Sequence, residues 1–163
     1  MISKRLSREE GHKRKFLAII DETPECRLAV AYASRSAKNT NGTLILLYVI
    51  DSSEFQHFLG VSDIMRAEAE ERAHMTLAHV SAEVRDMQGI EAEISVREGQ
   101  KADEIAKLIN EDQDIALLVL AASSNADGPG PLIQSIAAKG SSFSIPVTIL
   151  PDELSDEDMD ALT

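Results

Sequence analysis

The chain has 163 residues, with 28 Asp and Glu against 16 Lys and Arg, so its formal net charge is −12. This negative charge argues against a nucleic acid or an anionic membrane as the binding partner, because like charges repel. One cysteine excludes an internal disulfide framework and a cysteine-built metal site. No apolar run reaches the length of a membrane span, and the first residues lack the apolar stretch of a secretory signal. We therefore expect a cytoplasmic protein.

The two ends of the chain differ in charge. Residues 1–15 are rich in Lys and Arg, whereas residues 152–163 contain acidic residues and no basic one. Such runs are typical of solvated, partly disordered tails. We expect a basic N-terminal tail over 1–15, a single domain over 16–151 and an acidic C-terminal tail over 152–163. Contact between the tails, or docking of the acidic tail on a basic partner, is the alternative.

Apolar runs and amphipathic stretches alternate between the tails. Residues 16–20 (FLAII) predict a short strand, after which Thr23 is placed to cap a helix with Pro24 at its first position. Residues 44–50 (LILLYVI) fit a parallel strand covered on both faces. A long helix over 62–87 follows. Its expected buried stripe is Met65, Ala69, Ala73, Leu77, Val80, Val84 and Met87.

The second half repeats the alternation. The expected elements are a strand over 91–96 near a sheet edge, a helix over 101–110, a strand over 115–121, a helix over 131–139 ended by Gly140, and a strand over 147–150. This order predicts an α/β fold with a five-stranded, doubly wound parallel sheet. Ligands bind such sheets where the strand order reverses, so the loops after Ile20, Ile50 and Ala121 are candidate sites.

The first candidate loop begins with Asp21, whose carboxylate is placed to accept hydrogen bonds from a ribose or an adenine amine. The alternative is a plain turn or an acidic helix cap. In the third loop, Gly128 and Gly130 precede a helix and could bring backbone N–H groups to an anion. The alternative is a stiff Pro-Gly surface turn, since the neighbouring prolines lack N–H groups, and no lysine completes a Walker phosphate loop.

Catalytic and metal sites are not indicated. His74 and His79 are spaced so that they project from a helix in different directions, and Cys26 lies on an apolar helix face, as a quiet core thiol would. No nucleophile–base motif is evident. No Lys or Arg occurs between Lys107 and Lys139, which argues against a nucleotide hydrolase because phosphoryl transfer needs a cationic clamp. We therefore expect a protein that is not an enzyme.

Three stretches together resemble the universal stress protein family. Residues 16–51 are similar to its first β-α-β unit, with a strand ending at Asp21, small helix residues Ala29, Ala33 and Ala37, and a leucine-rich strand ending at Val49. Residues 97–122 (REGQKADEIAKLINEDQDIALLVLAA) are similar to its third strand, turn, helix and fourth strand. Residues 144–151 (SIPVTILP) are similar to its closing strand.

The resemblance implies a Rossmann-like fold of the adenine nucleotide alpha hydrolase type, a cytoplasmic location and a homodimer formed through the last strand, Val147–Leu150. It also implies an adenine nucleotide, ATP with Mg²⁺ or AMP. Asp21 matches the family position near adenine and ribose, and Val49 matches the strand-end residue whose backbone faces the adenine. The implied function is nucleotide-responsive signalling or stress tolerance without turnover, through an unidentified protein partner.

The family's phosphate motif, G-x2-G-x9-G-[ST], is only partly kept. Gly130 and the pair Gly140-Ser141 match its second half, but the pair follows the predicted last helix instead of opening it. Counting from the fourth strand places Ser135 as the phosphate-binding hydroxyl, with Gly128 and Gly130 around the phosphates. The departure keeps an alternative open, a dimeric interaction module of the same family that binds no nucleotide.

Overall fold

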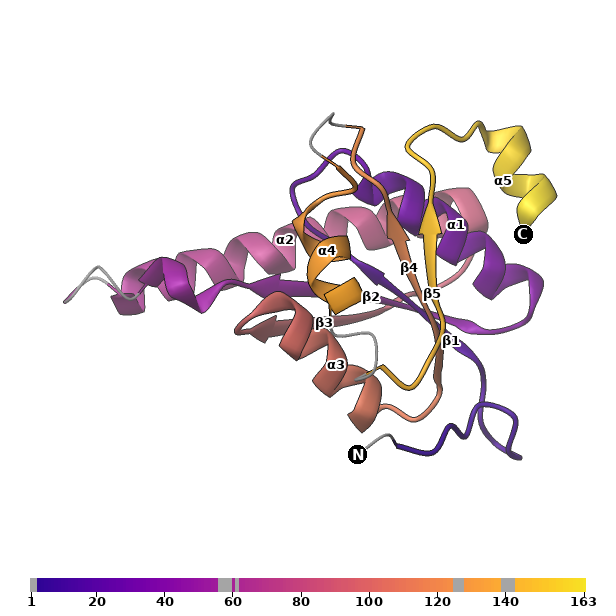
Figure 1. Ribbon diagram of the computed structural model, residues 1–163, viewed down its shortest axis with the longest axis horizontal. Helices are drawn as coiled ribbons and strands as arrows, with labels where there is room; N and C mark the ends of the chain where they lie inside the picture. The colour runs from indigo at the N-terminus through magenta and orange to yellow at the C-terminus, as the bar shows by residue number, and fades with distance from the viewer. Residues whose placement is uncertain (1–2, 56–59, 61, 125–127, 139–142) are drawn as a thin grey trace.

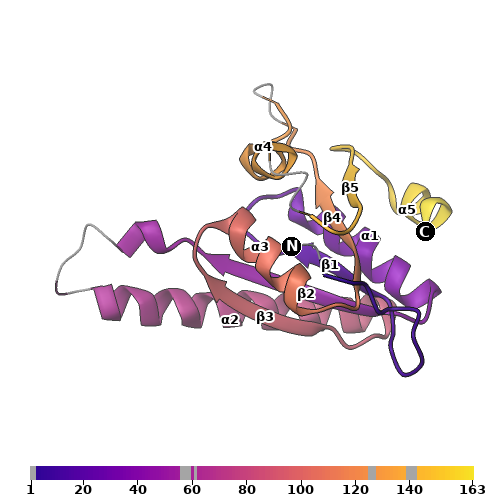
Figure 2. The same cartoon turned by 60° about the horizontal axis from the view of Figure 1, so that its bottom comes forward.

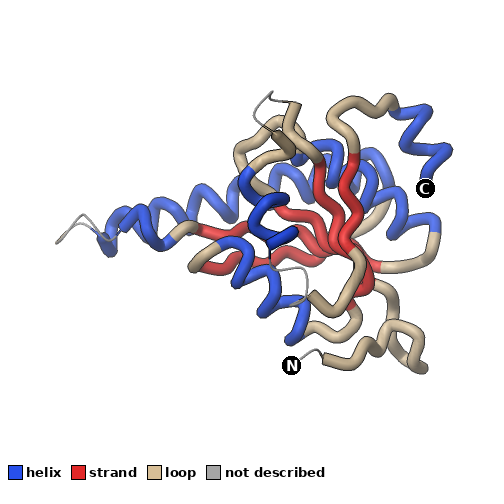
Figure 3. The backbone as a smooth tube through the Cα atoms, viewed as in Figure 1, coloured by secondary structure: helices blue, strands red, loops and turns tan. Residues whose placement is uncertain are grey.

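The computed structural model describes residues 3–55, 60, 62–124, 128–138 and 143–163. Its centre is one five-stranded parallel sheet with the strand order β3-β2-β1-β4-β5 (Figures 1 and 3). The strands are β1 (Lys15–Ile19), β2 (Thr43–Ile50), β3 (Glu93–Glu98), β4 (Ile115–Ala121) and β5 (Val147–Leu150). The predicted α/β fold with a doubly wound parallel sheet is therefore confirmed.

Helices cover both faces of this sheet (Figure 2). They are α1 (Cys26–Asn39), α2 (Ser62–Gln88), α3 (Lys101–Glu111), α4 (Pro131–Ala138) and α5 (Asp156–Leu162), with a short 3₁₀ helix, η1 (Ser52–Phe55). None of these described helices is both long and apolar enough to cross a membrane.

The central strand β1 divides its side chains between the two layers. Leu17 and Ile19 pack with α3 and α4, whereas Phe16, Ala18 and Ile20 pack with α1 and α2. Burial on both faces explains why the strand sequences are continuous apolar runs and do not alternate.

The strand order reverses between β1 and β4. From β1 the chain proceeds outward to β2 and β3, and it then returns to place β4 and β5 on the other side of β1. The register keeps the carboxyl ends level, with Ile19 beside Leu47 of β2 and Ala18 beside Val119 of β4. This reversal positions a candidate site beyond Ile19 and Ala121.

Some element boundaries differ from the expectation. The helix after β1 begins at Cys26, and its N-cap is Glu25 without a side-chain hydrogen bond, so the prediction that Thr23 caps it is wrong. Thr23 instead donates to the carboxylate of Asp21, which competes for the same hydroxyl. The third strand is an edge strand, as expected, but it lies two residues later than predicted.

The buried stripe of α2 is also shorter than predicted. Ala69, Ala73, Leu77 and Val84 are buried, but Met87 is 61 % exposed. The spacing of apolar residues identifies a helix face without showing what covers it, and near Met87 the face opens into a hollow between α1 and α2.

The first described part of the N-terminal segment is docked on the domain and is not a solvated tail, whereas residues 8–13 are exposed. The backbone N–H of Leu6 donates to the carbonyl of Gln113 at 2.9 Å. The guanidinium of Arg5 donates to the carbonyls of Ile109 at 2.7 Å and Ile115 at 3.2 Å. These contacts hold the segment against the end of α3 and the start of β4. The sequence interpretation missed these contacts because the charge of a segment does not show which of its Lys or Arg side chains will donate to backbone carbonyls.

The C-terminal segment is not a disordered tail either. Ser155 and Asp158 form a reciprocal capping box that starts α5, and Met159 is only 1 % exposed. Arg35 of α1 pairs with Asp160 at 2.8 Å and Asp156 at 3.3 Å. Figure 1 shows α5 beside α1. The acidic composition predicted a tail, whereas the segment forms a helix that is held by the buried side chains of Met159 and Arg35.

Candidate functional site

A cavity of about 240 Å³ opens at the carboxyl ends of β1 and β4, where the strand order reverses. Its wall includes Asp21 and Cys26 from the β1–α1 turn, Lys101 from α3, Gly130 from the loop after β4, and Ser135 from α4. Helices from both layers of the fold thus contribute to this cavity, which is where doubly wound sheets hold ligands.

The structure divides the residues predicted from sequence. Asp21, Gly130 and Ser135 share the cavity. Val49 lines a separate hollow of about 370 Å³ beyond the end of β2. Gly128 lies beside the side chain of Gln134, outside the linings of both hollows. The pair Gly140-Ser141 falls outside the described residues.

Asp21 directly follows the part of β1 that is hydrogen-bonded to β2. The N–H of Ile20 still donates to the carbonyl of Leu47 at 2.7 Å. Asp21 Oδ1 accepts from both the backbone N–H of Thr23, at 2.9 Å, and the Thr23 hydroxyl. One oxygen of the carboxylate therefore stabilises the turn. Its other oxygen, Oδ2, lies 3.8 Å from Lys101 Nζ, and the Asp21 side chain is 20 % exposed.

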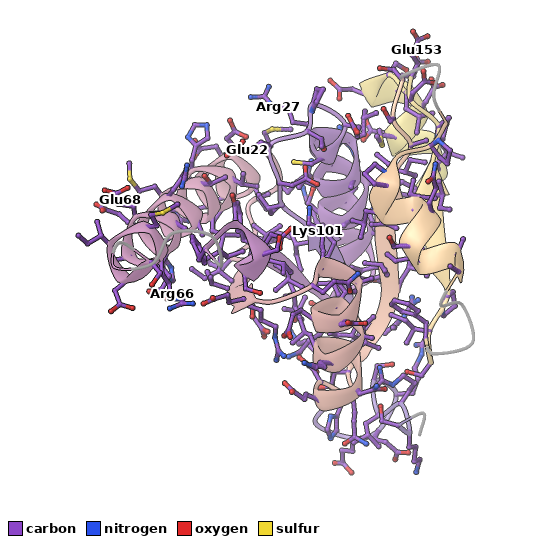
Figure 4. The ribbon with its side chains drawn as sticks, turned by 60° about the vertical axis from the view of Figure 1, so that its left-hand side comes forward. Glu22, Arg27, Arg66, Glu68, Lys101 and Glu153 are labelled. Carbon is purple, nitrogen blue, oxygen red and sulfur yellow. The ribbon has the colours of Figure 1, made fainter. Side chains whose placement is uncertain are left out.

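Lys101 is the site residue that sequence reasoning missed. It lines both the cavity and the hollow beside Val49, so its side chain stands between them. Figure 4 shows Lys101 at the end of α3 nearest α1. A cation at the first position of a helix is unfavourable against the helix dipole. That unusual placement, just after the Gln100 cap, was the signal available in the sequence.

The end of β2 is built like the end of β1. Asp51 Oδ1 accepts from the Ser53 backbone N–H at 2.9 Å and the Ser53 hydroxyl at 2.7 Å. These hydrogen bonds hold the pKa of Asp51 below its ordinary value, and the charge of Lys101 adds to that effect. The repeated pattern Ile-Asp-x-Thr or Ile-Asp-x-Ser thus places a carboxylate that accepts hydrogen bonds within its own turn after β1 and after β2.

Two described parts of the segment before α4 are hydrogen-bonded to each other. The N–H of Ser123 donates to the carbonyl of Pro129 at 2.9 Å. Gly128 and Gly130 have φ angles of +111° and +110°, which side chains with a Cβ rarely adopt. Gly130 and Ser135 both lie on the cavity wall.

Cys26 lies at the start of α1 and is half-buried. Its thiol donates to the carbonyl of Asp21, with an Sγ–O distance of 3.7 Å. Burial raises the pKa of this thiol, so it stays protonated and weakly nucleophilic at neutral pH. Among the described residues, no group of three or more His, Cys, Asp or Glu side chains is arranged to hold a metal ion.

The sequence profile described as Universal stress protein family matches residues 13–151. The chain belongs to the universal stress protein family. No curated protein resembles the chain closely enough to count as a match.

Solved structures of universal stress proteins share this fold. UspA from Lactobacillus plantarum has a TM-score of 0.70 at 16 % identity, covering 84 % of this chain and 97 % of its own. A family protein from Arabidopsis thaliana with AMP bound has a TM-score of 0.60 at 16 % identity, covering 88 % and 94 %. The universal stress protein from Archaeoglobus fulgidus in complex with dAMP has a TM-score of 0.58 at 14 % identity, covering 83 % and 96 %.

Proposed function

We propose that this universal stress protein binds an adenine mononucleotide at the cavity between β1 and β4 and acts as a nucleotide-responsive signalling module without turnover. The observation that carries the proposal is the meeting of Asp21, Gly130 and Ser135 on one cavity wall at the reversal of strand order. Two structural neighbours, from Arabidopsis thaliana with AMP bound and from Archaeoglobus fulgidus in complex with dAMP, support the class of ligand.

In the proposed complex, the adenine occupies the hollow beside Val49, the ribose lies against Asp21, and the phosphate lies near Gly130 and Ser135. In this arrangement the cavity of about 240 Å³ holds the ribose and the phosphate, and the separate hollow of about 370 Å³ holds the adenine. The small volume left for phosphate favours AMP over ATP, whose longer phosphate chain would also bring Mg²⁺.

A binding role without turnover is consistent with the charges at the site. Phosphoryl transfer needs cations on the departing phosphate and a residue that orients the nucleophile. Lys101 is the one Lys or Arg in the described lining of the cavity, and its ammonium is already opposite Asp21.

The proposal includes a homodimer formed through β5. This strand is at the edge of the sheet and pairs with β4 alone among the described strands. Ile149 on it is 50 % exposed. An unpaired edge with an exposed apolar side chain is a template for a second strand. Light scattering of the wild type and Ile149→Lys tests this part, with a shift from dimer to monomer expected.

Two measurements test nucleotide binding. Mass spectrometry of the denatured protein detects adenine nucleotide retained from the cell, and calorimetry measures the affinity for AMP, ADP and ATP with and without Mg²⁺. We expect micromolar AMP binding that Asp21→Ala weakens about tenfold, the loss of a hydrogen bond to a charged group. Asp63→Ala is the control, because that side chain is 98 % exposed. Absence of binding at millimolar nucleotide would favour the dimeric interaction module instead.

A further inference from the structure

A second and larger hollow lies on the other side of the β1–α1 turn, between α1 and α2. We call it the α1–α2 groove; its volume is about 740 Å³. Its floor is apolar, since Val30 and Val84 are buried and Leu28 and Val80 pack partly against the same core. Met87 lines the groove with 61 % of its surface exposed.

The α2 wall of the groove is long and regular. The residues that line it, Thr76, His79, Val80, Glu83, Val84, Asp86 and Met87, follow the three- and four-residue spacing of one helix face. At 1.5 Å per residue, the stretch from Thr76 to Met87 is about 16 Å long, or three helical turns. A groove between two helices with this length matches an added helix.

The rim of the groove is acidic. Glu22, Glu83, Asp86 and Asp156 line it, and Arg27 is the one Lys or Arg in its described lining. Figure 4 shows Glu22 and Arg27 on this side of the molecule. Glu83 pairs with His79 at 3.0 Å, and Asp156 pairs with Arg35. Within the described residues, neither Glu22 nor Asp86 has an ion-pair partner within 4.0 Å.

We propose that the α1–α2 groove binds a basic amphipathic helix of a partner protein. The apolar side of that helix packs on Val80, Val84 and the adaptable side chain of Met87, and its Lys or Arg residues face the acidic rim.

The chain's own segments fit this groove poorly. Its last helix, α5, is acidic and docks on α1 through Met159 and Arg35. Its basic N-terminal segment forms no helix in the described residues 3–14 and is held against Gln113 by Leu6. In a second copy, α5 would place acidic side chains against the acidic rim, and the basic N-terminal segment would offer no helix. A different protein is therefore favoured as the partner.

The groove and the cavity share a wall. Asp21, Thr23 and Cys26 line both, so the β1–α1 turn and the first residue of α1 contribute to both hollows. The groove proposal does not depend on nucleotide binding, because its floor and rim are formed by α1 and α2 alone apart from this turn and Asp156.

The test uses the full chain without nucleotide and a fluorescent helical peptide of Leu and Lys, with the Leu residues on one face. A peptide with Glu in place of each Lys is the charge control. Fluorescence anisotropy should show saturable binding of the Lys peptide and much weaker binding of the Glu peptide. Absence of saturable binding to the wild type would overturn the proposal.

Matched variants locate the binding. Glu83→Lys/Asp86→Lys reverses charge at the groove, and Glu68→Lys/Glu71→Lys makes the same net change on α2 outside it. We expect the groove variant to weaken the Lys peptide at least about tenfold more than the control. Equal losses would show binding to overall negative charge and refute a groove site.

The apolar contact has its own pair of variants. Met87→Ser changes the groove, and Met75→Ser changes a methionine that is 67 % exposed elsewhere on α2. Only Met87→Ser should weaken the peptide, and circular dichroism confirms folding of each variant. A change of oligomeric mass in Met87→Ser by light scattering would identify a second copy as the occupant and overturn the proposed partner.

Discussion

Lys101 Nζ lies 3.8 Å from Asp21 Oδ2, so the first residue of α3 contacts the turn that follows β1. Because Lys101 lines both the cavity and the hollow beside Val49, this pair separates the two places that the proposed nucleotide occupies. A bound nucleotide therefore either displaces the Lys101 ammonium or forms an ion pair with it.

We expect Lys101→Met to change the selectivity between AMP and adenosine. Removal of the ammonium leaves Asp21 and Glu25 as the charged groups of the cavity lining, which disfavours a phosphate. Adenosine carries no charge and is not affected in this way. The ratio of AMP affinity to adenosine affinity should fall about tenfold. Lys107→Met on the same helix is the control, and an unchanged ratio for Lys101→Met would show that Lys101 does not act on the ligand.

Ser135→Ala should weaken AMP and leave adenosine unaffected. The proposed hydroxyl contact is made to the phosphate, and a hydrogen bond to a charged group contributes about 1.5–3 kcal/mol, or at least about tenfold in affinity. Ser124→Ala is the control, since this exposed serine lies outside the cavity lining. Equal weakening of AMP and adenosine would indicate a general effect on α4 and contradict the phosphate contact.

The pKa of Asp51 should rise toward its ordinary value in Ser53→Ala, because the variant loses the hydroxyl hydrogen bond that lowers it most and keeps the one from the backbone N–H. A carboxylate with a lowered pKa in the folded state stabilises the fold above its unfolded pKa, and this contribution disappears as pH falls through the folded value. The stability difference between wild type and variant should therefore be present at neutral pH and shrink below about pH 3. NMR titration measures the pKa of Asp51, and urea unfolding at neutral and at acidic pH measures the stability difference. A stability difference that persists at acidic pH would assign the effect to packing.

Met159→Ala should destabilise the protein by about 2–5 kcal/mol, the usual cost of truncating a buried large side chain. Leu162→Ala on the same helix should cost less than about 0.5 kcal/mol, because Leu162 is 58 % exposed whereas Met159 is 1 % exposed. Urea unfolding measures both values. Similar small effects would mean that α5 does not dock on α1.

The strands and the main helices were predictable because burial leaves a pattern of apolar residues in the sequence, periodic along a helix and continuous along a strand covered on both faces. Continuous apolar runs at residues 44–50 and 115–121 identified strands covered on both sides. The helix α5 was not predictable in this way, since its docking depends on Met159 within an acidic run and on Arg35 far away in the chain.

The candidate site was predictable only in part. Asp21 was identified by its place after a strand, and Ser135 by counting from the fourth strand against the family's phosphate motif; the structure brings both to one cavity. Lys101 was missed because its contact with Asp21 depends on the packing of α3 over β1, whereas the local sequence shows a cation at a helix start without showing its partner. For the same reason the sequence could not show that Val49 opens into a different hollow.

The wall formed by Asp21, Thr23 and Cys26 has one face toward the cavity and the other toward the α1–α2 groove. Thermodynamic linkage requires that if a nucleotide tightens the binding of a helix by some factor, the helix tightens the nucleotide by the same factor. The concentration of the partner then sets how much nucleotide the protein retains, although the two ligands never touch. The amount of bound partner would then report the nucleotide concentration, and a higher partner concentration would increase the amount of nucleotide that the protein retains.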